Sequence, residues 1–585
     1  MLKSWRKSLS SRITPFDRRF FTGKERFTVI GRGSLGGKAH GLALIKNILE
    51  KKLAPSFQPQ IEISIPTLTV ITTEFFDLFM KQNNLQEVAF SDFRDDQIAT
   101  AFQKAELPAQ LVGELLALIA QVHTPLAIRS SSLLEDAMFE PFASVYATKM
   151  IPNNHLDPDT RFRKLVEAVK FVYASTFFKD AKNYIQATRH KTEDEKMAVI
   201  IQEVVGVRHR QRFYPHISGV ARSYNFYPLG HARPAEGVVD LAIGLGKTIV
   251  DDGIAWSYSP AYPQANPPYN TLSDLLDQTQ HKFWAVNMGT PPEYNPIKET
   301  EYLMKFSLEE AEEDGILRYS ASTYRAQDDK IVYGIAEKGP RVIDFAPILK
   351  FDLLPLNEML RALLKISNEE LERAVEIEFA VTLDEQKGAP ARFGFLQIRP
   401  MVISEEKAEL TPADLSGERV LVASESALGN GILENICDII YTKPEKFNVH
   451  HSETIASELE VFNHRLLAQG QPYLLIGFGR WGTSDPQAGI PVRFGQICGA
   501  KVIVESALPE AHSMLSQGSH FFHNITSFKV LYISVSHWDQ YKIDWDWLLE
   551  QPVNQETEFV RHVRLPAPLK IKVDGTKGRG VITHD

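Results

Sequence analysis

Two short runs of alternating polar and apolar residues carry side chains suited to a metal ion and a phosphate. The runs are residues 375–381 and 395–400, and each has the period of two that is typical of a β-strand. Carboxylate and amide oxygens suit a hard cation such as Mg²⁺, and a guanidinium group suits a pair of phosphate oxygens. The runs predict a metal–nucleotide site, although such alternation taken alone is more often the solvated face of an antiparallel sheet. A hairpin of the two runs would place on one face Glu376, Glu378, Gln397 and Arg399.

A glycine-rich turn near the start of the chain is a second candidate for phosphate binding. The pattern predicts a short strand over residues 27–30 and a helix over residues 39–52, with Gly36, Gly37 and Lys38 between them. Small residues expose backbone N–H groups beside the positive end of a helix, and such groups can cradle phosphate. The spacing is not that of a Walker A motif, because no serine or threonine follows the lysine. Its residues alone fit a tight turn as well as a phosphate loop.

Two apolar strands supply further candidates. Residues 125–132 end in Arg129 and three serines, which suit phosphate oxygens and, equally, a capping cluster. Residues 197–205 form a second apolar run, for which a buried core strand is the default and the edge of an adenine pocket is the alternative. Gln202 and Glu203 are the two polar residues that interrupt this run.

Composition limits the classes of function. A length of 585 residues is too great for one compact core and suggests about three to five domains. The hydrophobic content of 44%, the charged content of 23% and the net charge of -9 are typical of a soluble globular protein and create no attraction for nucleic acid. No stretch approaches the roughly 20 apolar residues of a membrane span, and the N-terminus lacks an apolar signal core. Cys437 and Cys498 are too few for a disulfide framework or a zinc site, so we expect a reducing, cytoplasmic location.

The chain divides into five predicted segments. A basic arm covers residues 1–26, and we expect it to be solvated rather than to act as a targeting or membrane segment. Two α/β subdomains follow over residues 27–215 and 216–403. A charged linker over residues 404–417 then leads to a C-terminal domain of unknown role, residues 418–585.

The order of the motifs resembles the N-terminal nucleotide-binding domain of phosphoenolpyruvate synthase and pyruvate phosphate dikinase. The shared features are a Gly-Gly-Lys turn, an Arg-Ser-Ser strand end, a Ser-Gly-Val strand, a Gly-Leu-Gly turn, a Glu-x-Glu pair and a Leu-Gln-x-Arg-Pro run, over about residues 28–402. The resemblance implies an α/β fold of the ATP-grasp-like kind that binds ATP and Mg²⁺, with Lys38, Arg129 and Arg399 as catalytic cations. It further implies phosphate contacts from Gly36 and Gly37, adenine contacts from Gln202, Glu203 and Val205, and magnesium ligands Glu376, Glu378 and Gln397.

The chain also departs from that family. Lys247 stands where the family's Gly-Leu-Gly-Glu has its glutamate, and the Ser-Gly-Val strand continues with Ala221, Arg222 and Ser223 instead of Phe-Thr or Phe-Ser. No segment resembles the phosphohistidine domain or the phosphoenolpyruvate barrel. The phosphate acceptor is therefore unassigned. His520, which stands beside aromatic residues, is one candidate, against the more common core or surface histidine.

We expect an ATP- and Mg²⁺-dependent phosphotransferase of the kinase or dikinase type that acts on an unknown acceptor or acceptor protein. The retained lysine, acidic pair, glutamine and arginines support this expectation. A non-catalytic ATP-binding regulatory module and one subunit of a split dikinase are the alternatives, and the missing histidine domain and Lys247 favour them. A homo-oligomer is compatible with the sequence.

Overall fold

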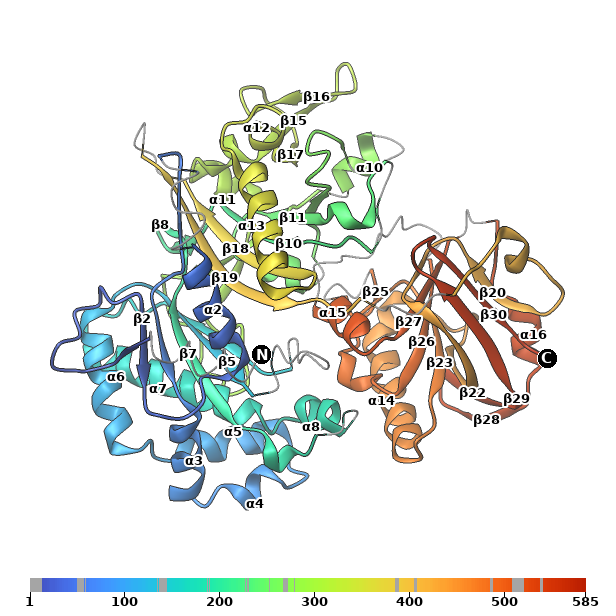
Figure 1. Cartoon of the computed structure of the whole chain (residues 1–585), viewed down its shortest axis with the longest axis horizontal. Coiled ribbons are helices and arrows are strands. Elements are labelled where there is room, and N and C mark those ends of the chain that lie inside the picture. Colours follow the sequence, from blue (N-terminus) through green and yellow to red (C-terminus); the bar gives the residue numbers. More distant parts are fainter. Residues whose placement is uncertain are drawn as a thin grey trace.

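The computed structural model shows two N-terminal lobes and a C-terminal domain, each made of helices and sheets (Figure 1), which confirms the α/β fold class. In the part of the chain that the structure describes, no helix is long and apolar enough to cross a membrane. Residues 1–12 of the predicted basic arm lie outside the described residues. The described residues are 13–49, 57, 59–133, 135, 145–186, 188, 190–226, 228, 231–251, 253–266, 272–277, 279–383, 389–403, 408–483, 488–507, 520–536 and 540–585.

The first lobe is built on a six-stranded sheet with the strand order β1-β2-β4-β7-β5-β6. A helical layer packs against it, and Leu165, Val169 and Val172 of α7 are fully buried at the spacing of a helix face. The strands are β1 (Thr14–Pro15), β2 (Phe27–Ile30), β4 (Leu68–Ile71), β5 (Leu126–Ser132), β6 (Thr148–Ile151) and β7 (Met197–Glu203). The helices are α2 (Gly36–Ile48), α3 (Thr73–Gln82), α4 (Gln86–Ala89), α5 (Asp95–Lys104), α6 (Ala109–Gln121), α7 (Pro158–Ser175) and α8 (Lys179–Gln186).

Helix α2 begins earlier than the sequence pattern predicts, so that Gly36, Gly37 and Lys38 form its first turn. Gly36 has a φ of 75°, and a Cβ atom there would lie 1.7 Å from the carbonyl oxygen of Ser131 in β5. Only glycine permits this approach of the helix to the strand. Because α2 contacts both β5 of the first lobe and β19 of the second, its first turn lies at the junction of the lobes (Figure 1).

The second lobe is built on a six-stranded sheet with the order β12-β11-β10-β18-β19-β3 and two smaller sheets, β14-β13-β9-β8 and β16-β15-β17. Strand β3 comes before residue 215 in the sequence but pairs in parallel with β19, so a segment of the N-terminal part of the chain belongs to the sheet of the second lobe. The predicted domain boundary at residue 215 stays a prediction. The strands are β3 (Ile61–Ser64), β8 (Val207–His209), β9 (Arg212–Tyr214), β10 (Ile217–Arg222), β11 (Val238–Ala242), β12 (Trp256–Tyr258), β13 (Lys282–Asn287), β14 (Leu303–Ser307), β15 (Ala321–Arg325), β16 (Lys330–Tyr333), β17 (Arg341–Ile343), β18 (Val375–Thr382) and β19 (Ala391–Pro400). The helices are α9 (Lys247–Val250), α10 (Leu272–Asp277), α11 (Leu308–Glu313), α12 (Ala346–Leu349) and α13 (Leu356–Leu371).

The C-terminal domain contains a nine-stranded mixed sheet, ordered β20-β30-β29-β22-β23-β26-β27-β21 with β28 beside β29. In the predicted linker, residues 404–407 lie outside the described residues, whereas Leu410 and Leu415 are buried against this sheet. The strands are β20 (Val420–Ser424), β21 (Ala427–Leu428), β22 (Asn430–Thr442), β23 (Tyr473–Phe478), β24 (Arg480–Trp481), β25 (Gly489–Ile490), β26 (Ala500–Ser506), β27 (Leu531–Val535), β28 (Val553–Glu556), β29 (Val560–Asp574) and β30 (Arg579–Thr583). The helices are α14 (Ser452–Ala468), α15 (His520–Ser527) and α16 (Trp545–Glu550).

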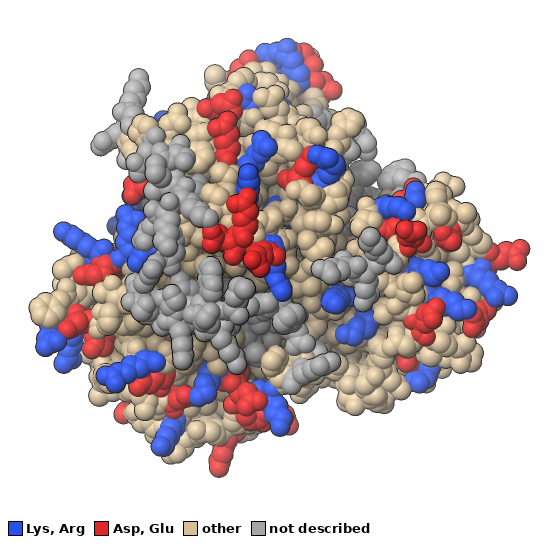
Figure 2. Space-filling model, in the orientation of Figure 1, with Lys and Arg blue, Asp and Glu red and all other residues tan. Residues whose placement is uncertain are grey.

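The C-terminal domain and the first lobe share one apolar core. The cluster of buried residues that contains Phe177 and Tyr184 of the first lobe continues into Phe494 and Ile525 of the C-terminal domain. Charged groups of both signs are mixed over the face that Figure 2 shows, including the parts of it formed by both regions. The two parts are held together by this apolar packing and by ion pairs such as that of Lys179 with Glu460.

Candidate functional site

Strands β18 and β19 form the hairpin that the sequence pattern predicts. In its register Glu376 lies opposite Arg399, and Glu378 lies opposite Gln397. The exposed fractions of Glu376, Gln397 and Arg399 are only 2%, 2% and 3%. The alternative of a solvated sheet face is therefore wrong for these residues. Charged groups this deeply buried require partners, and the hairpin supplies some of them.

The partners of Glu376 are two arginines. Arg222 of β10 donates from Nε to one oxygen of Glu376 over 2.6 Å and from another nitrogen to Asp240 over 3.0 Å. Arg399 contacts the other oxygen of Glu376. Burial opposes the ionisation of Glu376, but the two guanidinium groups outweigh it and hold the pKa of that carboxyl well below its usual range. Glu376 is thus an ionised anchor between two arginines.

Arg129 joins the first lobe to the second. Its guanidinium group donates to Oε1 of Gln397 over 2.6 Å and to the carbonyl oxygen of Leu396 over 2.9 Å. Within its own lobe it donates to Oε1 of Gln202 over 3.2 Å, and it lies 3.6 Å from Glu378. Arg129, Gln202, Glu378, Gln397 and Arg399, all predicted site residues, therefore lie in one cluster.

Lys38 lies beside this cluster but has partners of its own. Its ammonium group contacts Oε1 of Glu135 at 2.7 Å and donates to Oγ of Ser130 over 3.1 Å. Ser130 follows Arg129 in β5, so the lysine of α2 and the arginine of β5 are brought together by the close approach at Gly36. A ligand phosphate at this point would compete with Glu135 for the lysine.

The predicted adenine segment ends strand β7 where the chain passes from the first lobe to the second. The backbone N–H groups of Glu203 and Val204 already donate to the carbonyl oxygens of Thr67 and Pro125, each over 2.9 Å. Burial raises the pKa of the Glu203 carboxyl. The adenine contacts of Gln202, Glu203 and Val205 stay a prediction.

Some charged residues at the junction of the lobes lie outside any recognisable motif, so they were not identified from the sequence. Glu299 accepts a hydrogen bond of 3.2 Å from the backbone N–H of Thr148, which is the register partner of Arg129. Burial raises the pKa of Glu299, and the charges of Lys247 and Lys38 oppose that rise, so Glu299 lies within electrostatic range of both lysines. Lys247 itself pairs with Asp251 at 2.6 Å. In the sequence, Arg222 and Lys247 stood out only because they differ from the residues that the family has at these positions.

The oxygen atoms of the cluster can be compared with the ligands that Mg²⁺ requires. Among the described residues, no group of three or more histidine, cysteine, aspartate or glutamate side chains could hold a metal ion by itself. Mg²⁺ commonly takes only one or two protein oxygens and completes its shell with water and substrate phosphate. Glu378 and Gln397 are paired across the hairpin and fit that requirement. Glu376 stays a predicted ligand, although arginines contact both of its oxygens.

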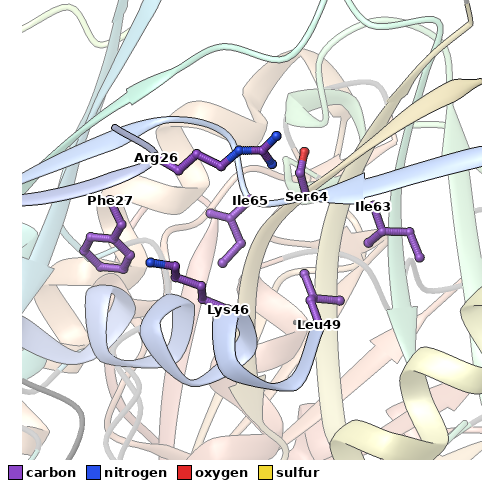
Figure 3. A pocket seen from close by; sticks show the side chains of 7 residues that line it. All are labelled: Arg26, Phe27, Lys46, Leu49, Ile63, Ser64 and Ile65. Carbon is purple, nitrogen blue, oxygen red and sulfur yellow. The ribbon is translucent and has the colours of Figure 1, made fainter. Parts of the chain in front are cut away.

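A cavity of about 110 Å³ lies beside the C-terminal part of α2, where Lys46 and Leu49 help to line it (Figure 3). Lys46 and Leu49, which help to line it, are separated from Lys38 by about two helical turns or more. None of the predicted site residues lines this cavity. Its walls are formed by Arg26, Phe27, Lys46, Leu49, Ile63, Ser64 and Ile65.

The position of Glu195 near Glu135, the partner of Lys38, predicts a pH effect on stability. Burial, and after it the negative charge of Glu135, raise the pKa of Glu195 to about 7 from an ordinary value of 4.5. Because the folded protein holds the proton more tightly, its stability should fall as the pH rises from about 4.5 to about 7, by up to about 3 kcal/mol. Glu195→Gln should therefore raise the melting temperature at pH 8 and leave it almost unchanged at pH 4.5.

Glu193→Gln, an exposed carboxylate two residues away, is the matched control and should have little effect at either pH. Thermal unfolding followed by circular dichroism measures both variants. If Glu195→Gln raised the melting temperature equally at the two pH values, the raised pKa of Glu195 would not be the cause.

Two lobes that bring buried arginines, carboxylates and a helix-borne lysine together at their junction define an ATP-grasp-like nucleotide-binding domain. A family model described as "Pyruvate phosphate dikinase, AMP/ATP-binding domain" matches residues 32–419. Because this match covers more than half of the chain, the protein belongs to that family. No curated protein matches the chain. The expected family is thus confirmed, and it implies ATP as a ligand.

Proposed function

We propose that the protein is an ATP- and Mg²⁺-dependent phosphotransferase of the dikinase class, with an acceptor that the C-terminal domain binds or presents. The observation that carries this proposal is the contact between the lobes, in which Arg129 donates to Gln397 over 2.6 Å beside Glu378 and Arg399. Phosphoryl transfer depends mostly on positioning and on neutralising charge on the phosphate oxygens. A cluster of buried cations and oxygen ligands meets both needs.

Each residue has a role in this proposal. Lys38, Arg129 and Arg399 bind phosphate oxygens and orient the group that is transferred. Glu378 and Gln397, with Glu376 as the third predicted ligand, would hold Mg²⁺. The metal would neutralise charge on the phosphates.

A non-catalytic nucleotide-binding role is the second candidate. The pairings of Lys38 with Glu135 and of Lys247 with Asp251 favour it, because protein carboxylates already neutralise these lysines. A split dikinase, with its histidine domain on another polypeptide, would use the same site residues as the first proposal.

Phosphorus NMR of the purified protein with Mg²⁺ and ATP tests the proposal. We expect slow formation of AMP and phosphate, which indicates dikinase chemistry, and faster formation with an acceptor; ADP would indicate an ordinary kinase. Glu378→Ala should lower the rate by more than about 100-fold, because the site loses a metal ligand. Glu358→Ala, an exposed carboxylate of α13, is the control. Tight ATP binding without turnover in any acceptor screen would favour the regulatory role.

A further inference from the structure

Helix α15 belongs to the C-terminal domain but lies beside the ends of β18 and β19, as Figure 1 shows. The ring of Phe522 in α15 packs edge-on against that of Phe226, with their centroids 5.5 Å apart. Phe226 follows β10 by four residues, and Arg222 is the last residue of that strand. The C-terminal domain therefore reaches the end of β10, the strand that carries Arg222.

The position of α15 is fixed by contacts with the first lobe. The hydroxyl of Tyr184 in α8 donates to Oδ1 of Asn524 over 3.3 Å, and the Tyr184 ring meets that of Phe528 edge-on at 4.9 Å. Arg493 pairs with Asp180 at the same interface. The residues on both sides of His523 in the sequence are thus held against the nucleotide-binding lobes. The backbone of His523, which lies between these residues in α15, is held in place by the same contacts.

His523 is 4% exposed, and its Nε2 atom is buried without a hydrogen-bond partner in the described part of the chain. It lies within electrostatic range of Arg399, Glu376 and Arg222. Burial, together with the guanidinium groups, lowers the pKa of His523 to about 3, so its ring is neutral at neutral pH. A buried polar atom without a partner is costly in a native protein and calls for a functional explanation.

We propose that His523 is a positioning residue of the nucleotide site, through which the C-terminal domain sets the orientation of Arg399. A neutral imidazole offers a polar atom to the cluster without adding a third positive charge to those of Arg222 and Arg399. Docking of α15 would then complete the site, and the C-terminal domain would be part of the nucleotide-binding machinery as well as a candidate acceptor module. The inference rests on the proposed phosphate role of Arg399.

The test replaces the imidazole while keeping the packing of α15. His523→Phe retains a ring without nitrogen atoms, and His523→Gln restores a polar side chain. We expect His523→Phe to lower kcat by about 10- to 100-fold and to change the KM for ATP by less than about threefold, because a displaced Arg399 affects the transition state most. His523→Gln should recover much of this loss. His450→Phe, at an exposed histidine of the same domain, should leave kcat unchanged.

A double-mutant cycle makes the inference testable without turnover. The Kd for Mg²⁺-ATP is measured by calorimetry for His523→Phe, Arg399→Lys and the double variant in the full chain. We expect His523→Phe to raise the Kd about threefold in the presence of Arg399, in line with its small effect on KM, and to leave the Kd unchanged once Arg399 is replaced. If the wild-type protein binds no ATP, the same cycle is measured on the midpoint of urea unfolding.

The outcomes separate the two proposals. ATP binding without turnover contradicts the proposed phosphotransferase, whereas the cycle still decides the role of His523. Independent effects of the two substitutions, or wild-type kcat in an active His523→Phe variant, would overturn the positioning role. Loss of kcat that His523→Gln fails to relieve would overturn it as well, because packing alone would then explain the histidine.

Discussion

Replacing Arg399 with alanine is expected to reduce phosphoryl transfer from ATP by a factor of about 10³ or more, the range known for arginines that stabilise the transferring phosphoryl group. Arg399 is 3% exposed and lies 3.4 Å from Glu378, the better placed of the two predicted acidic metal ligands. In such a buried place its charge is little screened by water. Steady-state kinetics with the nucleotide products resolved by phosphorus NMR measures the loss.

The fold should survive this substitution, because Glu376 keeps its contact with Arg222. Circular dichroism and the melting temperature check that expectation. Arg399→Lys should be intermediate, since an ammonium group preserves the charge but not the two-pronged geometry. Arg361→Ala, at an exposed position of α13, provides the control. A folded Arg399→Ala variant with more than about a tenth of wild-type activity would refute the catalytic assignment.

Replacing Arg222 with methionine should destabilise the protein by about 3–5 kcal/mol. Arg222 is 1% exposed and bonds to both Asp240 and Glu376, which are themselves buried. Methionine fills much of the space but leaves Asp240 without its cation and Glu376 with only Arg399. Removing one partner of a buried ion pair leaves an uncompensated charge, which is why the cost exceeds that of an exposed pair. Urea unfolding at neutral pH measures the change.

The destabilisation should shrink in acid. In the wild-type protein the lowered pKa of Glu376 contributes stability above its ordinary value of 4.5, and that contribution is lost as the pH falls towards the folded-state pKa. In the variant the buried carboxylates can take up protons more readily, so the two unfolding free energies should converge below about pH 4.5. Arg361→Met is the control for a surface change. A loss smaller than about 1 kcal/mol at neutral pH would show that Arg222 is not essential to the core.

The hairpin and its chemistry could be read from the sequence because both are local. A period of two placed Glu376 and Glu378 on one face, and the same rule placed Gln397 and Arg399 together. The structure bears out that pairing. Periodicity also predicted the helix after the glycines, but not its start at Gly36, because that start depends on the contact with Ser131 in β5.

By itself the sequence determined the α/β class, the family and the residue types of the candidate site, since these follow from short patterns and from their order along the chain. Tertiary structure alone decided that Arg129 meets Gln397, that Arg222 occupies one side of Glu376 and that His523 of the C-terminal domain lies near Arg399. The reason is physical. Such contacts join segments far apart in sequence, and only the packing of the lobes and the shared apolar core fixes which of the many polar side chains are brought together and buried.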